Sequence, residues 1–343
     1  MNSKPTQMKK IFIILFTTVS LNSCSQQKDE GATTIIPPTP TPVLKDIFLA
    51  DPTIFYNEGT YYLYGTTTGN TALNGEGFQV YTSSDQKNWK GPLGAQGGLA
   101  LKKGDAYGSE GFWAPQILKH NNQFYMFYTA NENIAVATGS NPLGPFRNAS
   151  KQPLAASVKQ IDPFVFIDND GKKYLYHVRL TNGNRIFVAE LNDDFLSIKP
   201  ETLKECIAAE LQWENTQNVN WPVAEGPTVL KKGGLYYLIY SANDFRNPDY
   251  AVGYATSKSP LGPWKKSTTS PIISRNLIGE NGPGHGDIFL DKDNQLQYVL
   301  HTHFNVTNEA PRKAAIIELN FVEKEQEFKL EAKKESFRFL KIN

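Results

Sequence analysis

Short apolar runs recur along the chain, and each is followed by a polar or glycine-containing turn and a second run rich in tyrosine and phenylalanine. Such paired runs predict β-hairpins, because aromatic and β-branched side chains suit a half-buried pleated strand. We expect five such hairpins, over residues 51–64, 114–128, 162–176, 225–240 and 285–300.

A third strand is expected after each hairpin, and no strong amphipathic helix intervenes. These strands are predicted over residues 78–82, 134–138, 186–190, 251–256 and 314–319. Corresponding positions are marked by Pro52, Pro115, Pro163, Pro227 and Gly286, at spacings of 63, 48, 64 and 59 residues. A small sheet repeated five times favours an all-β, five-bladed β-propeller. A β-sandwich is the alternative, but nothing in its topology demands a repeat this regular.

The first 24 residues have the pattern of an export signal. Lys9 and Lys10 precede the apolar run 11–16, which is too short to span a bilayer but has the length of a signal-peptide core. The segment Leu-Asn-Ser-Cys that ends at Cys24 resembles a bacterial lipobox, although Asn22 is atypical there. We therefore expect residues 1–23 to be a lipoprotein-type signal peptide with Cys24 lipidated; a plain cleaved signal is the alternative.

The segment after Cys24 predicts a tether on the outside of the cell. Residues 25–30 resemble the acidic signal that sends lipoproteins to the outer surface, so we expect an exported, outer-membrane lipoprotein at the cell surface. Residues 24–44 are rich in proline and threonine, which favours an extended linker. The propeller domain is then expected over residues 45–343.

Charge and cysteine content narrow the classes of partner. The chain has 35 basic and 34 acidic residues without a basic stripe, which argues against nucleic-acid binding. Its two cysteines are Cys24 and Cys206, so acylation of Cys24 excludes an intramolecular disulfide. The stability of the domain must then come from its core, and we expect a monomer.

Ionisable residues open four of the five hairpins. They are Asp51, Asp162, Glu225 and His285, whereas Ala114 opens the second hairpin. The first strand of each propeller blade lines the central channel, so these side chains should converge. An aspartate before proline is often only a turn former, but gathering several charges without a function is costly. The set predicts a polar pocket for acid–base chemistry on a neutral substrate.

These openings also resemble a known family. The segments that begin at Ala50 (Ala-Asp-Pro-Thr-Ile), Phe112 (Phe-Trp-Ala-Pro), Ile161 (Ile-Asp-Pro), Glu225 (Glu-Gly-Pro) and Gly282 (Gly-Pro-Gly-His) are similar to the blade-opening motifs of glycoside hydrolase family 43. The resemblance covers residues 47–320 in the expected order. It implies a five-bladed propeller that inverts anomeric configuration and acts mainly on α-L-arabinofuranosides and β-D-xylosides, with some members acting on galactans.

The resemblance also implies residue roles. Asp51 would be the general base, Glu225 the general acid, and Asp162 the residue that orients Glu225 and raises its pKa. His285 matches a channel histidine that lies near a calcium ion in some members, and Arg312 matches an arginine that contacts the sugar. No cofactor is expected to be required; one calcium ion in the channel is the open alternative.

Two tryptophans near these motifs have competing interpretations. Trp113 is expected to form a wall against the sugar, with packing between blades as the alternative. For Trp221, just ahead of Glu225, packing is favoured. The long loops 69–78, 90–112 and 206–223 have no pattern that identifies the sugar.

The function predicted from the sequence is therefore a glycoside hydrolase that releases pentose-type sugars from plant-type polysaccharide or oligosaccharide, with exo action as the first expectation. Three alternatives stay open: a galactan- or galactofuranoside-acting member of the same family, a carbohydrate-binding propeller with weak turnover, and a scaffold for protein partners. The Asn-Asp-Pro-Asn-Gly run of the five-bladed fructan hydrolases does not occur in the sequence.

Overall fold

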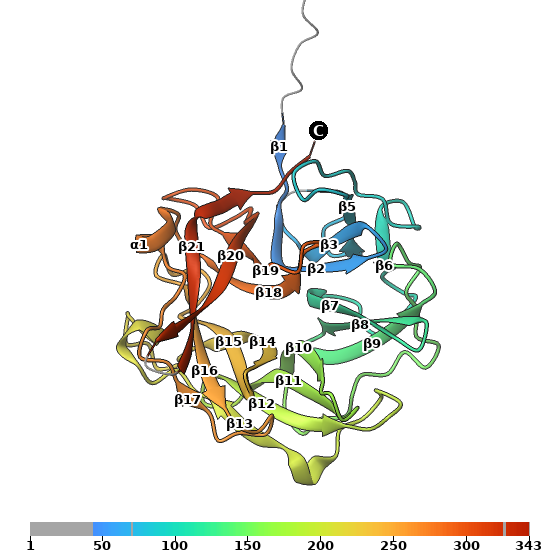
Figure 1. Ribbon diagram of the computed structural model, residues 1–343. Coiled ribbons are helices and arrows are strands. Elements are labelled where there is room, and N and C mark those ends of the chain that lie inside the picture. The colour runs from blue at the N-terminus through green and yellow to red at the C-terminus, as the bar shows by residue number, and fades with distance from the viewer. Residues whose placement is uncertain (1–43, 70, 325–326, 343) are drawn as a thin grey trace, which may run out of the picture. The chain divides into compact units, whose positions relative to one another are not determined.

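The computed structural model describes residues 44–69, 71–324 and 327–342, which form small antiparallel sheets arranged around a central axis (Figure 1). The inner strands contact one another in a closed ring from the first blade to the fifth. This confirms the predicted five-bladed β-propeller. The predicted signal peptide, Cys24 and nearly all of the tether lie outside the described residues.

Each blade is built outward from the axis in chain order. The inner strands are β2 (Leu49–Asn57), β7 (Trp113–His120), β10 (Gln160–Ile167), β14 (Ala224–Lys232) and β18 (Gly284–Leu290). The second strands are β3 (Thr60–Thr67), β8 (Gln123–Ala130), β11 (Lys173–Leu180), β15 (Leu235–Ala242) and β19 (Leu296–Thr302). The third strands are β5 (Tyr81–Ser83), β9 (Asn133–Gly139), β12 (Asn184–Leu191), β16 (Ala251–Ser257) and β20 (Lys313–Lys324).

Blades three to five have a fourth strand that the sequence analysis did not predict. These strands are β13 (Lys204–Ile207), β17 (Lys265–Lys266) and β21 (Glu327–Phe339). Blade one differs in another way, because the strand predicted over residues 78–82 is divided at Val80. Its first half, β4 (Gly77–Gln79), pairs with β6 (Leu99–Lys102), and only β5 pairs with β3.

The remaining elements are short. The strands β1 (Lys45–Asp46) and β22 (Lys341–Ile342) pair with each other, and the helical turns are η1 (Pro200–Thr202), η2 (Gln212–Glu214) and α1 (Arg275–Ile278). Figure 1 shows β1 and β22 close together beside blade one. Within the described ranges, none of the helices is long and apolar enough to cross a membrane.

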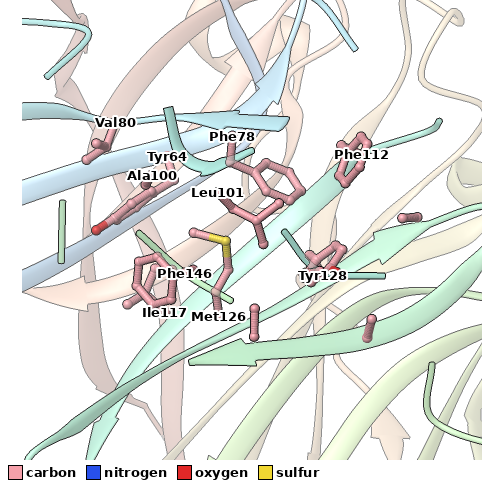
Figure 2. Packing of buried hydrophobic residues seen from close by; sticks show 14 of the residues in the cluster. Tyr64, Phe78, Val80, Ala100, Leu101, Phe112, Ile117, Met126, Tyr128 and Phe146 are labelled. Atoms are coloured by element: carbon pink, nitrogen blue, oxygen red, sulfur yellow. The ribbon is translucent and has the colours of Figure 1, made fainter. Parts of the chain in front are cut away.

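The core lies between neighbouring blades, where aromatic side chains of the second strands are buried. Between blades one and two, the Phe78 ring packs edge-on against Phe112 and Tyr128 at centroid distances of 5.9 and 5.5 Å (Figure 2). Tyr64 lies in the same cluster and donates its hydroxyl to the Pro142 carbonyl. Each such buried ring contributes about 1.5–3 kcal/mol, so this packing holds the inner strands in position around the axis.

Every inner strand has the same irregularity near its start. Pairing with the second strand shifts between Ala50 and Thr53 in blade one, and an equivalent shift occurs in the other four blades. One residue in each bulge has a positive φ angle: Asp51 (48°), Ala114 (44°), Asp162 (55°), Gly226 (59°) and His285 (38°). Such bulges re-aim side chains and store local strain, and they occur often beside functional sites.

The predicted equivalence of Glu225 with Asp51 and Asp162 is wrong by one residue, as the positions of the bulges show. Gly226, and not Glu225, is equivalent to Asp51 and Asp162; Glu225 lies one residue earlier, at the position of Trp113. Successive side chains along a strand point in opposite directions, so the glutamate is aimed differently from the two aspartates. A side chain is also excluded at Gly226, because an added Cβ atom would lie 2.9 Å from the His285 ring.

Candidate active site

A pocket of about 420 Å³ opens at the bulged ends of the inner strands. It brings together all six residues that the sequence analysis proposed for catalysis and substrate binding. It is lined by Asp51, Trp113, Ile161, Asp162, Asn184, Trp221, Val223, Glu225, Asp244, Phe245, Arg246, His285 and Arg312. Asp51, Asp162 and His285 also line the central channel below, whereas Trp113 and Glu225 face only the pocket. This division follows from the one-residue difference in the bulge.

Asp51 is surrounded by groups that favour its charged form. Thr66 Oγ1 donates a hydrogen bond to Oδ2 at 2.6 Å, and Arg312 Nη1 donates to Oδ1 at 3.1 Å. Burial alone would raise the pKa of Asp51, but the positive charge of Arg312 and the hydrogen bond from Thr66 hold that pKa well below its usual range. Asp51 is therefore an ionised carboxylate at neutral pH.

Glu225 has the opposite electrostatic character. Tyr250 donates its hydroxyl to Oε1 and Asn184 Nδ2 donates to Oε2, both at 2.9 Å. Burial raises the pKa of Glu225 to about 7, although these two hydrogen bonds oppose the shift. Near neutral pH this carboxyl group therefore retains a proton that it can donate.

Asp162 interacts with both of these carboxyl groups. Burial raises the pKa of Asp162 well above its usual range, and repulsion from Glu225 and Asp51 raises it further. The Gly226 N–H donates to Oδ2 at 3.3 Å, and this bond and the charge of Arg312 oppose the shift. Asp162 and Glu225 therefore compete for a proton, a coupling that the sequence analysis did not foresee for Asp162 itself.

A repeated hydrogen bond connects neighbouring blades behind these side chains. The N–H of each bulge residue donates to a side chain at the end of the preceding blade's second strand. The pairs are Ala114 to Thr66, Asp162 to Thr129, His285 to Ser241 and Asp51 to His301, at 2.8–3.1 Å. At the remaining junction Val178 occupies the equivalent position and offers no acceptor, so the Gly226 N–H bonds to Asp162 instead.

His285 is a neutral histidine inside the site. Burial lowers its pKa, and Nδ1 lies 3.4 Å from Asp51 Oδ1 and 3.8 Å from Asp162 Oδ2. Below it in the channel, Asp287 accepts hydrogen bonds from the hydroxyls of Thr53 and Thr228 at 2.8 and 2.7 Å. The His285 ring thus lies beside the carboxyl groups of Asp51 and Asp162.

These residues fit calcium poorly by themselves. Calcium prefers six to eight oxygen ligands, and the described residues contain no group of three or more His, Cys, Asp or Glu side chains arranged to hold a metal. Both Asp287 carboxylate oxygens already accept hydroxyl protons. A calcium ion near His285 stays a prediction, and water would have to supply most of its ligands.

The aromatic wall differs in part from expectation. Trp113 is 37% exposed and lines the pocket, in keeping with the predicted sugar contact. The packing role favoured for Trp221 is wrong, because this side chain is 50% exposed and lines the pocket as well. Arg312 also lines the pocket, but its guanidinium lies against Asp51 and over the Phe245 ring, 4.5 Å from the centroid.

Comparison with known proteins places the chain in a family. The profile of Glycosyl hydrolases family 43 matches residues 39–325. The chain belongs to this family. A solved structure described as an endo-1,4-β-xylanase from Bacteroides thetaiotaomicron is 42% identical, with a TM-score of 0.79, over 88% of this chain and 99% of that one. A thermostable family-43 glycoside hydrolase is 36% identical, with a TM-score of 0.73, over 83% of this chain and 93% of the other.

Curated relatives are more distant. A β-D-galactofuranosidase from Aspergillus niger is 26% identical over 58% of both chains. A xylosidase/arabinosidase from Butyrivibrio fibrisolvens is 28% identical over 76% of this chain and 50% of its own length. An arabinoxylan arabinofuranohydrolase from Bacillus subtilis is 26% identical over 75% of this chain and 57% of its own. The chain therefore spans only between half and six tenths of these relatives.

In this family-43 chain, several residues that control the carboxyl groups were not predicted from the sequence. Thr66 and His301 lie at the ends of second strands, and Asn184 and Tyr250 lie at or beside the start of third strands. Each is a common polar residue without a local motif. The sequence did hold a signal for the offset of Glu225: Asp51 and Asp162 directly precede a proline, whereas Gly226 separates Glu225 from Pro227.

Proposed function

We propose that this protein is an inverting glycoside hydrolase that releases pentose-type sugars, as α-L-arabinofuranosyl or β-D-xylosyl residues, from plant-type polysaccharide or oligosaccharide. The observation that carries the proposal is the opposite electrostatic setting of two carboxyl groups in one pocket. Arg312 keeps Asp51 ionised, while burial keeps Glu225 protonated near neutral pH. Inverting hydrolysis needs one carboxylate base and one carboxylic acid in these states.

The proposed reaction uses each group once. Asp51 accepts a proton from a water molecule as the water oxygen forms a bond to the anomeric carbon. Glu225 donates its proton to the glycosidic oxygen as the bond from that oxygen to the anomeric carbon breaks. Asp162 would orient Glu225, and repulsion between these two buried carboxyl groups favours a state in which they hold at least one proton between them. Return of the Asp51 proton to solvent and reprotonation of Glu225 complete the cycle.

The activities named for two relatives support a pentose substrate. The relatives from Butyrivibrio fibrisolvens and Bacillus subtilis are a xylosidase/arabinosidase and an arabinoxylan arabinofuranohydrolase. The β-D-galactofuranosidase of Aspergillus niger favours galactofuranosides as the second candidate substrate. A third candidate, sugar binding with weak turnover, is disfavoured because binding a neutral sugar would not need a base and an acid with opposite charge states.

We also propose export and a lipid anchor. Relatives from Cellvibrio japonicus and Streptomyces avermitilis, 26% and 22% identical, are named extracellular exo-α-(1→5)-L-arabinofuranosidases, which supports an extracellular site of action. The anchor would be Cys24, with the protein at the surface of the outer membrane. This part of the proposal rests on the sequence of the first 30 residues.

A substrate panel tests the proposed activity. Purified protein is assayed with aryl α-L-arabinofuranoside, β-D-xyloside and β-D-galactofuranoside, with Asp51→Ala as the matched inactive control. We expect one of the two pentosides to be hydrolysed fastest, and NMR to show inversion in the first product formed. Preference for the galactofuranoside would select the second substrate; a retained anomer, or no turnover of any glycoside, would overturn the mechanism.

A further inference from the structure

Trp221 lies where two hollows of the surface meet. Its half-exposed side chain lines the active-site pocket and also a neighbouring hollow of about 390 Å³. This outer hollow is lined by Gln217, Val219, Trp221, Asp244, Arg246 and Asn247. An exposed indole beside amide and charged side chains is a lining that suits a sugar, which has an apolar ring face and many hydroxyl groups.

Two hydrogen bonds connect this tryptophan to the proposed general acid. Trp221 Nε1 donates to Asn184 Oδ1 at 2.9 Å, and Asn184 Nδ2 donates to Glu225 Oε2 at 2.9 Å. An indole N–H can only donate, so it requires the oxygen of the Asn184 amide to face it. The NH₂ group of the same amide is then directed at Glu225.

We propose that Trp221 is a positioning residue that binds the leaving-group sugar of the substrate on its ring and, through Asn184, fixes the orientation and proton affinity of Glu225. The inference rests on the proposed function of Glu225 as the general acid. It extends that function by assigning the outer hollow to the sugar on the leaving-group side. Binding of that sugar and the orientation of the Glu225 carboxyl group would thus both depend on the Trp221 side chain.

The physical reason lies in the two orientations of the Asn184 amide. Without the indole N–H, the amide is free to turn and present its oxygen to Glu225. That oxygen would accept a hydrogen bond from the protonated Glu225 carboxyl group. This bond stabilises the neutral carboxyl and directs its proton away from the glycosidic oxygen. The present bond from Asn184 lowers the pKa of Glu225, so its loss moves that pKa upward.

The test is Trp221→Phe, which keeps an aromatic ring but removes the N–H. Rates are measured against pH with a pentose oligosaccharide and with an aryl glycoside that has a good leaving group. We expect the basic limb of the oligosaccharide profile to move to higher pH and kcat to fall roughly tenfold, the effect of one lost hydrogen bond. The aryl glycoside should lose little, because its leaving group needs little protonation. Trp221→Ala should in addition raise KM for the oligosaccharide alone.

Two further variants separate this role from a general disturbance. Trp113→Phe changes the other tryptophan of the pocket and should leave the basic limb in place. Asn184→Ala should move the limb as Trp221→Phe does, and combining the two should move it no further. Thermal unfolding checks that each variant is folded, which the exposure of Trp221 favours.

The results can contradict the role of Trp221 without contradicting the proposed hydrolase activity. An active wild type with an unmoved limb in Trp221→Phe, or with additive shifts in the double variant, overturns the role of Trp221 and leaves the hydrolase assignment intact. A wild type that hydrolyses none of the glycosides overturns the proposed function, and the inference falls with it.

Discussion

The N–H of Gly226 donates to Asp162 Oδ2 at 3.3 Å, and it does so at the blade junction where Val178 replaces an acceptor side chain. At the other four junctions a threonine, serine or histidine accepts the equivalent N–H. Because Val178 has no acceptor atom in its side chain, the Gly226 N–H is left to donate to Asp162. The bond lowers the pKa of Asp162 against the effect of burial, which makes Val178 a means of testing the carboxyl pair.

Val178→Thr should restore the missing acceptor and draw the Gly226 N–H away from Asp162. The pKa of Asp162 then rises further, so Asp162 takes up the proton that Glu225 would otherwise hold. We expect lower kcat near neutral pH and a basic limb displaced to lower pH, measured in a pH–rate profile. Val178→Ala is the matched control, since it adds no acceptor; it should lower stability by about 1–2 kcal/mol and leave the limb in place. Equal profiles for both variants would contradict the role of the Gly226 bond.

Arg312→Met should raise the pKa of Asp51, because the guanidinium is the main group that keeps this buried carboxylate ionised. The acidic limb of kcat/KM should therefore move to higher pH. Arg246→Met removes an exposed arginine from the same pocket, one that is paired with Asp244, and should alter KM without moving that limb. An acidic limb that stays in place in Arg312→Met would show that another group than Asp51 controls it.

Alanine substitutions of the two proposed catalytic residues should differ in their dependence on the leaving group. Asp51→Ala should lower kcat by about 10²–10⁴ on every substrate, because the base is needed whatever group departs. Glu225→Ala should show a loss of that size on oligosaccharides but a much smaller one on aryl glycosides with acidic leaving groups. Steady-state kinetics on a series of aryl pentosides measures this; the same leaving-group dependence in both variants would refute the assigned roles.

Glu225→Gln should stabilise the protein at alkaline pH. The folded-state pKa of Glu225 is about 7 against an ordinary value of 4.5, so the folded state binds the extra proton. Its contribution to stability is complete below about pH 4.5 and is lost as pH rises to about 7. Glutamine does not titrate, so its advantage over wild type should be larger at pH 8 than at pH 4.5, by up to about 3 kcal/mol. Urea unfolding at both pH values measures the difference; an equal effect at both would contradict the raised pKa.

Cys24→Ala should release the protein from membrane fractions, because acyl chains supply about 0.8 kcal/mol of anchoring free energy per buried CH₂ group. Fractionation of cells followed by immunoblotting measures the distribution. Cys206→Ala is the control, since it removes the other cysteine and should leave the protein with the membranes. Membrane association that survives Cys24→Ala would rule out the proposed anchor.

The sequence by itself determined the architecture and the identity of the convergent groups. Five repeats of strand, turn and aromatic strand specify five blades, because each repeat buries its aromatic face only against the next one. The residues Asp51, Asp162 and His285 also follow from the repeat, since equivalent positions on inner strands must meet at the axis. The local sequence pattern was sufficient to predict these three residues, because the direction of their side chains follows from their equivalent positions in the repeat.

Only the tertiary structure decided how the three carboxyl groups differ in direction and in charge state. The bulge places Glu225 one position before the residue equivalent to Asp51 and Asp162. Glu225 therefore faces only the pocket, whereas the two aspartates also line the channel. The partners that set the charge states, such as Arg312 for Asp51 and Asn184 for Glu225, come from other strands and are up to 261 residues away. Electrostatic interactions depend on distance in space and on burial, and neither is encoded in a local run of residues.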